Sequence, residues 1–145
     1  MAAFVKFRRF VTDKAAGVHV NALNASTDTL KIYLSNTAPD VDADQVKADL
    51  AEISGGNGYT AGGHDTQNSA STSAGTITVT GTDVTITASG GDIGPFRYVV
   101  LYNDTPTSPA DPLIGYWDRG AAITLTGANG DSFTTDFGAS LFTDS

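Results

Sequence analysis

Two histidines, His19 and His64, are the side chains of this sequence that ordinarily titrate near neutral pH, which makes them the first candidates for acid–base chemistry. They lie 45 residues apart, and neither has a neighbouring histidine or a cysteine with which to form a zinc site. The chain contains no cysteine, which also excludes disulfides and thiol nucleophiles. No nucleophile elbow, P-loop, dinucleotide fingerprint or His-Glu-x-x-His motif occurs. We therefore expect no catalytic residue, no metal site and no cofactor.

The acidic run Asp40-Val-Asp42-Ala-Asp44 has the spacing with which a calcium-binding loop begins. Such a loop needs a glycine at its sixth position, where Gln45 stands, and a glutamate at its twelfth, where Ala51 stands. Aspartates that precede a helix also cap its free N–H groups. Capping is the simpler interpretation, and the sequence predicts a short helix over residues 40–53.

Two other groups of residues could act on a carbohydrate if the fold brought them together, as paired carboxylates or as an aromatic surface. The candidates are Asp65, Asp92, Asp104 and Asp118, and Tyr98, Tyr102, Tyr116 and Trp117. Aspartates at strand ends and aromatic residues within strands are also ordinary features of a β protein. Turn formation and core packing therefore explain both groups more simply.

The distribution of charge bears on the partners of the protein. The net charge is −8, and the first 14 residues carry +3, from four basic residues and one aspartate. The rest of the chain carries −11, from 4 basic and 15 acidic residues, and such an acidic body is not expected to bind free nucleic acid. The apolar runs are far shorter than the ~20 residues of a membrane helix. Residues 1–10 also lack the apolar segment of a secretory signal.

The N-terminal segment, residues 1–27, combines aromatic and basic side chains. Phe4, Phe7 and Phe10 recur every third residue, and between them lie the basic residues Lys6, Arg8 and Arg9. This spacing fits one face of a helix and also fits an extended arm. We expect the segment to contact another molecule, with the phenylalanines in a groove of the partner and the basic residues on an acidic surface.

Short runs of Val, Ile, Thr and aromatic residues between turn signals predict strands in the rest of the chain. The expected strands cover residues 28–36, 75–80, 83–88, 96–103, 113–118, 121–126 and 132–137. Residues 96–103 form the most hydrophobic run and are expected at the centre of a sheet. Gly81-Thr82 and Asn129-Gly130 are expected to turn two hairpins. The sequence thus predicts a mainly β fold, a single-domain antiparallel β sandwich or barrel of about seven strands, with one or two short helices and a β domain over residues 28–145.

A long segment rich in Gly, Ser, Thr and Asn, residues 54–75, is expected to be a loop. It has little apolar surface to offset its ordering entropy, so we expect it to become ordered against a neighbouring subunit. The residues proposed for this contact are Asn57, Gly58, Tyr59, Gly62 and Gly63.

Three segments of the sequence resemble a family of small structural proteins from tailed bacteriophages. They are Asn57-Gly-Tyr-Thr-Ala-Gly-Gly63, Gly94-Pro-Phe-Arg-Tyr-Val-Val-Leu-Tyr-Asn-Asp-Thr105 and Pro112-Leu-Ile-Gly-Tyr-Trp-Asp118. Residues 28–39 and the Phe-Val-Lys-Phe run at residues 4–7 belong to the same likeness, which spans nearly the whole chain. The resemblance brings no catalytic residues with it.

The resemblance implies a non-enzymatic component of the virion. The role we expect is that of a capsid decoration, or cement, protein on the outer capsid surface, with the major capsid protein and copies of itself as partners. A tail tube, tail-tip or fibre-associated protein, with other tail proteins as partners, is the alternative. A carbohydrate-binding module or small hydrolase is the third interpretation.

Overall fold

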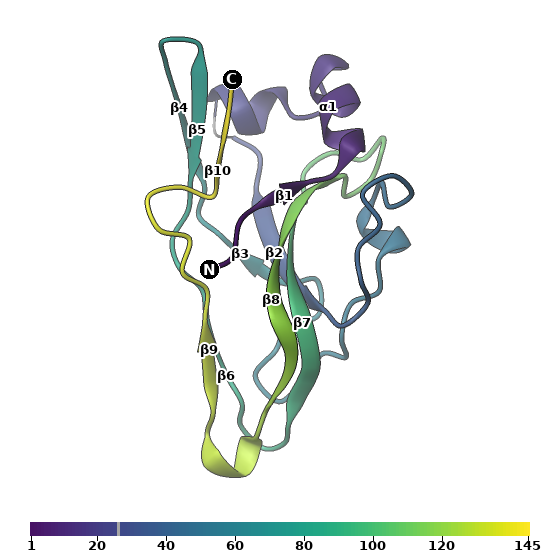
Figure 1. Ribbon diagram of the computed structural model, residues 1–145, viewed down its shortest axis with the longest axis vertical. Helices are drawn as coiled ribbons and strands as arrows, with labels where there is room; N and C mark the ends of the chain where they lie inside the picture. Colours follow the sequence, from purple (N-terminus) through teal and green to yellow (C-terminus); the bar gives the residue numbers. More distant parts are fainter. Residues whose placement is uncertain (26) are drawn as a thin grey trace.

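The computed structural model describes residues 1–25 and 27–145 and is mainly β, as the sequence predicts (Figure 1). The strands are β1 (Val5–Lys6), β2 (Leu30–Ser35), β3 (His64–Asp65), β4 (Ser69–Ser73), β5 (Thr76–Thr80), β6 (Thr85–Thr87), β7 (Ile93–Asn103), β8 (Leu113–Leu125), β9 (Ser132–Thr134) and β10 (Phe142–Asp144). The helical elements are α1 (Arg8–Ala15), the π-helical turn η1 (Asn21–Ala25) and the 3-10 turns η2 (Lys47–Asp49) and η3 (Gly127–Asn129). None of the helices in the described residues is long and apolar enough to cross a membrane.

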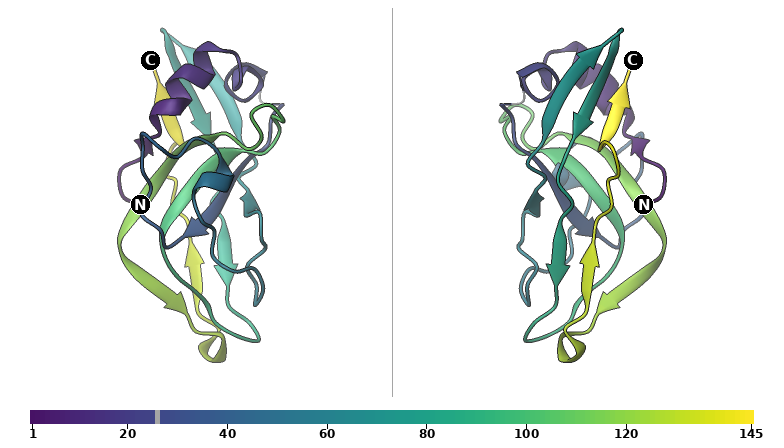
Figure 2. Two further views of the ribbon diagram at one scale, coloured as in Figure 1. Left: turned by 90° about the vertical axis from the view of Figure 1, so that its right-hand side faces the viewer. Right: turned by 90° about the vertical axis from the view of Figure 1, so that its left-hand side faces the viewer.

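All the sheets are antiparallel, and they form two layers. One layer is a single sheet with the strand order β1-β8-β7-β2-β3. The other layer contains the sheet β10-β5-β4 and the two-stranded sheet β6-β9. Figures 1 and 2 show β4, β5, β10, β6 and β9 along one side of the molecule and the long strands β7 and β8 along the other. This arrangement confirms the expected antiparallel β sandwich.

Strand β7 lies at the centre of the larger sheet, between β2 and β8, as its hydrophobic sequence predicts. Its residues alternate between two apolar clusters. Val99 and Leu101 pack into the core between the two layers, whereas Tyr98, Val100 and Tyr102 face a second, smaller cluster. The sheet is therefore buried on both faces, and the segment that contains Leu50 covers the outer one.

Both predicted hairpins are wrong, because the strands concerned pair with other partners. Strands β5 and β6 belong to different sheets, and the hairpin that forms is β4–β5, turned by Ala74 and Gly75 at φ of 50° and 79°. Similarly, β8 does not pair with β9, which pairs with β6 instead. The segments at Gly81 and at η3 carry the chain across between sheets rather than back along one sheet.

The predicted helix over residues 40–53 is also wrong, since only the single turn η2 forms there. The backbone of residues 45–47 pairs instead with the segment before β8, where the Lys47 N–H donates to the Asp111 carbonyl and the Leu113 N–H donates to the Gln45 carbonyl. Asp40 Oδ1 accepts hydrogen bonds from the N–H groups of Asp42 and Ala43, and Asp49 Oδ2 accepts from those of Gln45 and Val46. These aspartates therefore cap short turns, as the sequence suggests, and the long-range backbone pairing of residues 45–47 leaves no room for a continuous helix.

Candidate functional site

The phenylalanines of the N-terminal segment lie in the protein's own core. Phe7 and Phe10 are 0 % exposed, and the ring of Phe10 packs edge-on against that of Phe142 with centroids 5.7 Å apart. Phe4 stacks on Phe142 at 5.2 Å and also contacts Trp117. The expectation that a partner's groove receives these rings is therefore wrong. Strand β1 pairs with β8 and directs the segment across the sandwich, so its apolar side chains are buried within the chain.

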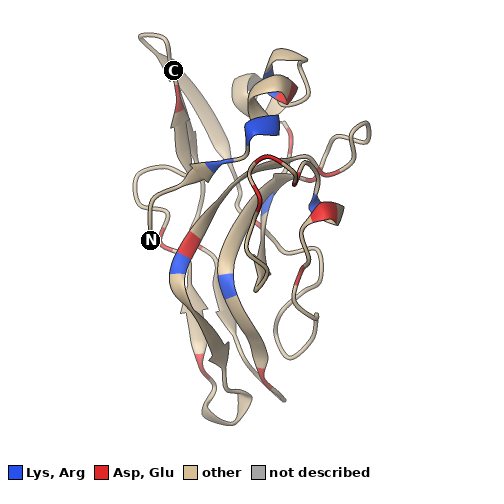
Figure 3. Ribbon diagram, turned by 45° about the vertical axis from the view of Figure 1, so that its right-hand side comes forward, with Lys and Arg blue, Asp and Glu red and all other residues tan. Residues whose placement is uncertain are grey.

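The basic residues of the segment are likewise bound within the chain. The ion pairs are Lys6 with Asp144, Arg8 with Asp42, Arg9 with Asp13 and Lys14 with Asp144. Of these four, the Arg8 pair is the most exposed, and an exposed pair contributes only ~0–1 kcal/mol. Figure 3 marks charged residues on α1, β1, β7 and β8 and in several loops, and the β4–β5 hairpin contains none.

The predicted long loop, residues 54–75, contains β3, β4 and the turn that leads into β5, and two of its glycines, Gly58 and Gly63, fit closely against the body of the protein. A Cβ atom on Gly63 would lie 2.0 Å from the carbonyl oxygen of Ile32, and one on Gly58 would lie 2.1 Å from that of Thr87. The Nδ2 atom of Asn57 donates to the carbonyl of Asp92. Because these contacts are made within one chain, the expectation that the loop needs a neighbouring subunit for its order is wrong.

Glu52, the only glutamate in the sequence, holds this loop in place. Its Oε1 atom accepts hydrogen bonds from the Tyr59 hydroxyl at 2.7 Å and from the Gly62 N–H at 2.8 Å. Its Oε2 atom pairs with Lys47 Nζ at 2.6 Å. Tyr59 is 2 % exposed, and its hydroxyl also accepts the N–H of Leu34 at 3.0 Å. Sequence reasoning placed Tyr59 at a contact site but did not find Glu52, because nothing in the spacing of a lone glutamate indicates its partners.

The tyrosines around Glu52 are not suited to proton transfer near neutral pH. Burial, together with the hydrogen bond to Glu52, raises the pKa of Tyr59 far above its usual value. Burial also raises the pKa of Tyr33 and of Tyr102. Their hydroxyls donate to the backbone carbonyls of Leu50 and Gly62. The cluster thus fixes the backbone and has the character of a structural network.

We expect Tyr59→Phe to lower the free energy of unfolding by about 1–3 kcal/mol, because it leaves the Leu34 N–H without its acceptor and removes one donor to Glu52. Tyr116→Phe is the matched control, since Tyr116 is half-buried and its hydroxyl makes no hydrogen bond in the described part of the chain. Urea denaturation measures both. Equal stability of the two variants would contradict a structural role for the Tyr59 hydroxyl.

The carboxylates considered for carbohydrate chemistry are each bound to a different group. Asp118 pairs with Arg97 through both oxygens at 2.7 and 2.9 Å, which lowers the pKa of Asp118. The other three serve Lys31 or backbone N–H groups: Asp104 pairs with Lys31, Asp65 accepts from Gln67 and Asp92 from Gly127. Within residues 1–25 and 27–145, no three His, Asp or Glu side chains are grouped so that they could hold a metal ion.

The aromatic residues considered for sugar binding are mostly in the interior. Tyr98, Tyr102 and Trp117 are no more than 8 % exposed, and Tyr116 is half-buried. Core packing therefore accounts for these four residues. The Tyr98 and Tyr116 rings, for example, contact each other edge-on with centroids 6.1 Å apart. His64 packs against Tyr59, and burial lowers the pKa of His64.

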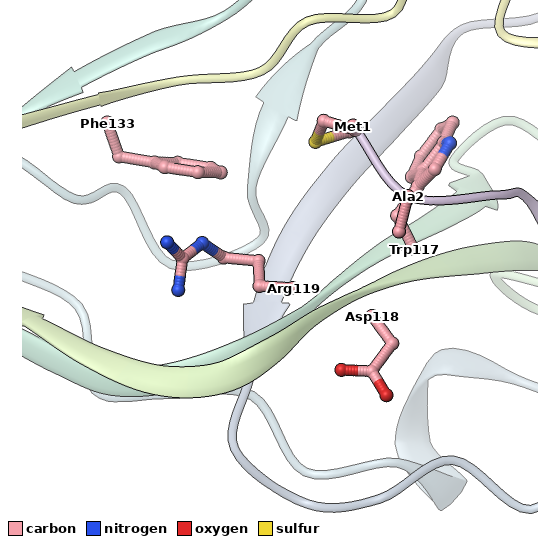
Figure 4. Close-up of a pocket in the computed structure, with 6 residues that line it drawn as sticks. All are labelled: Met1, Ala2, Trp117, Asp118, Arg119 and Phe133. Carbon is pink, nitrogen blue, oxygen red and sulfur yellow. The ribbon is translucent and has the colours of Figure 1, made fainter.

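A hollow of about 180 Å³ opens beside β8, and its lining is Met1, Ala2, Trp117, Asp118, Arg119 and Phe133 (Figure 4). Strand β8 bulges here, since it advances from Asp118 to Ile123 while the paired β7 moves only from Tyr98 to Phe96. Figure 4 shows Arg119 directed toward Phe133 and Asp118 on the opposite side of the strand. The Arg119 guanidinium lies 5.5 Å from the Phe133 ring and donates to the Ala121 carbonyl. This shallow, mainly apolar hollow presents no pair of groups suited to acid–base catalysis.

The protein is thus a small antiparallel β sandwich in which the glutamate, tyrosine and aspartate side chains described above bind other groups of the same chain. No protein-family model, no curated protein and no solved structure matches the chain.

Proposed function

We propose that the protein is a structural component of a tailed-bacteriophage virion and that it decorates the outer capsid surface. The observation that carries the proposal is the role of the three segments on which the resemblance rests. The first supplies Tyr59 and the close-packed Gly58 and Gly63, and the other two supply most of β7 and the start of β8. Segments that build a rigid scaffold are what a protein acting through its surface requires.

The distribution of polar groups favours the same function. Within residues 1–25 and 27–145, seven ion pairs use seven of the eight basic side chains. Many aspartates accept backbone N–H groups in turns, as Asp131 does for Thr126 and Asp136 for Gly138. Side chains bound in this way hold the loops in one conformation. Fixed loops suit a protein that makes the same contact many times in a shell better than they suit an enzyme that must bind and release substrate.

One layer of the sandwich offers a broad surface for such contacts. Along β4 and β5 the residues on the face opposite the buried Val79 are all hydroxylic, and the pairs are Ser69 with Thr80, Ser71 with Thr78 and Ser73 with Thr76. The sheet β6-β9 continues the pattern with the pairs Thr85–Thr134 and Thr87–Ser132 opposite the buried Ile86. An uncharged face lets a body of net charge −8 approach copies of itself or an acidic shell with little repulsion. We place the contact with the capsid on this face.

The test is a copy count in purified particles of the phage that encodes the chain. Heads and tails are separated, and quantitative mass spectrometry compares the chain with the major capsid protein in each fraction. We expect it in the head fraction at a copy number comparable to that of the capsomers. High copy number confined to tails would replace decoration by a tail-tube role, and a handful of copies on tails would indicate a tip or fibre protein. Absence from both fractions would overturn the virion assignment.

A further inference from the structure

A buried polar cluster lies where α1 and η1 meet the ends of β2 and β7. His19 is 0 % exposed, and its ring packs against that of Phe10 with centroids 5.1 Å apart. Its Nδ1 atom lies 3.3 Å from Nδ2 of Asn103, which also donates to Asp28 Oδ2 at 2.9 Å. The cluster joins the N-terminal helices to the sheet through side chains that do not touch the Glu52 network.

The bonds around Asn103 fix the protonation state of His19. Asn103 Oδ1 accepts the N–H of Thr105, and its Nδ2 donates to a carboxylate, so the amide is oriented by both neighbours. Nδ2 therefore presents a hydrogen to His19 Nδ1, which must accept it, and the ring proton lies on Nε2. A second proton on the ring would place two donors, Nδ1–H and Nδ2–H, against each other.

Two buried atoms of the cluster have no hydrogen-bond partner in the described chain. They are His19 Nε2 and Asp13 Oδ2, on residues that are 0 % and 2 % exposed. The other oxygen of Asp13 pairs with Arg9 Nε at 2.7 Å. Unsatisfied buried polar atoms cost stability and concentrate where a structure is built to open or to react.

We propose that the cluster is an acid-sensitive latch, in which protonation of His19 releases α1 and η1 from the sandwich while the sheets stay folded. The carboxylates that face His19 are Asp13 on α1 and Asp28 ahead of β2, and the Arg9 guanidinium offsets part of the charge on Asp13. Release uncovers the apolar surface under α1, including the ring of Phe142 that contacts Phe10. Acid thus makes a second, apolar contact surface available, which goes beyond a static decoration role.

The electrostatic balance has the sign that this latch requires. Burial lowers the pKa of His19 from 6.5 to about 4, although Asp13 and Asp28 act in the opposite direction. The open state takes up a proton as the pH falls through 6.5, whereas the closed state does so only near 4. The stability contributed by the neutral ring is therefore complete above pH 6.5 and is lost progressively below it. Between pH 6.5 and about pH 4, the population of the open state should rise on the order of a hundredfold.

The experiment is amide hydrogen exchange by NMR on the isolated full chain, at about pH 7 and about pH 4.5, on the two sides of the ordinary histidine pKa. We expect the protection factors of α1 and η1 to fall on the order of a hundredfold relative to those of β7 and β8. In His19→Asn, which keeps an acceptor for Asn103 but does not titrate, the fall should be largely absent. His64→Asn is the control and should behave like the parent.

Three results would overturn the latch: unchanged protection of α1 and η1 at low pH, an equal fall in every strand, or an undiminished fall in His19→Asn. If His19→Asn does not fold, the NMR titration of the His19 ring signals in the parent protein replaces it as the test. Titration near 6.5 with α1 still protected would also exclude the latch. These measurements need no virion, so they stand or fall separately from the capsid assignment.

Discussion

Replacing Phe10 with alanine should lower the free energy of unfolding by about 3–5 kcal/mol, the usual cost of deleting a fully buried aromatic ring. The ring is 0 % exposed and contacts both His19 and Phe142, so the cavity would have walls from α1, from the turn after it and from β10. Urea or thermal denaturation measures the loss. An effect this large would show that the packing of the N-terminal segment on the sandwich contributes to the stability of the closed protein.

Val11→Ala is the matched control, because Val11 is the next residue of α1 and is 55 % exposed. We expect it to change stability by no more than about 0.5 kcal/mol. Deletion of residues 1–10 also removes β1, Phe4 and Phe7, so it should destabilise the sandwich by more than Phe10→Ala does, whereas the sequence-based picture of a separate β domain over residues 28–145 predicts little effect. A Phe10→Ala protein as stable as Val11→Ala would restore the hypothesis that the phenylalanines of residues 1–27 bind a partner's groove.

Replacing Gly63 with alanine should be the most damaging single-methyl change in the glycine-rich loop. The new Cβ would lie 2.0 Å from the Ile32 carbonyl oxygen and 3.1 Å from the Tyr33 Cβ, so backbone on β2 or β3 would have to move. Gly63 also has φ of +86°, which costs an L-residue ~1–3 kcal/mol before any clash. We expect a total loss of about 3 kcal/mol or more, or a protein that does not accumulate in folded form.

Gly62→Ala separates the two contributions. Gly62 has φ of +92°, close to that of Gly63, but a Cβ there would meet no atom within 4 Å. Its variant should therefore show only the conformational cost, ~1–3 kcal/mol. Circular dichroism and chemical denaturation compare the two. If Gly62→Ala proved as destabilising as Gly63→Ala, the close contact of Gly63 with β2 would not contribute to the free energy of unfolding.

Sequence reasoning predicted best the strands that can be identified from their own residues, without knowing which strands they pair with. Residues 28–36 and 96–103 show alternating or continuous apolar character, and they became β2 and the main part of β7. The hairpins failed because a turn signal shows only that the chain bends. Gly81 satisfies such a signal, yet it lies where a Cβ would meet the Leu141 side chain, and the chain there changes sheets.

The candidate site shows a similar division between local and long-range information. Three phenylalanines at intervals of three indicate burial, and two of them are fully buried, but the spacing does not reveal whether the burying surface belongs to the same chain. Ring partners more than 100 residues away contribute to that surface: Tyr116 contacts Phe7, and Phe142 contacts Phe10. Residues 54–75 were misjudged for the same reason, because the contacts of Gly63 with β2 and of Tyr59 with Glu52 depend on the tertiary fold.

The pairing of Lys6 with Asp144, across 138 residues, sets a limit on how this protein can form during translation. Phe142, on which the rings of Phe4 and Phe10 pack, leaves the ribosome 138 residues after Phe4 and 132 residues after Phe10. At typical rates of about 5–20 residues per second, the aromatic segment must wait roughly 7–28 seconds before Phe142 can cover it. Non-local contacts of this kind also slow folding itself. Expression yield should therefore depend on chaperone supply and on growth temperature more steeply than the stability of the finished sandwich would indicate.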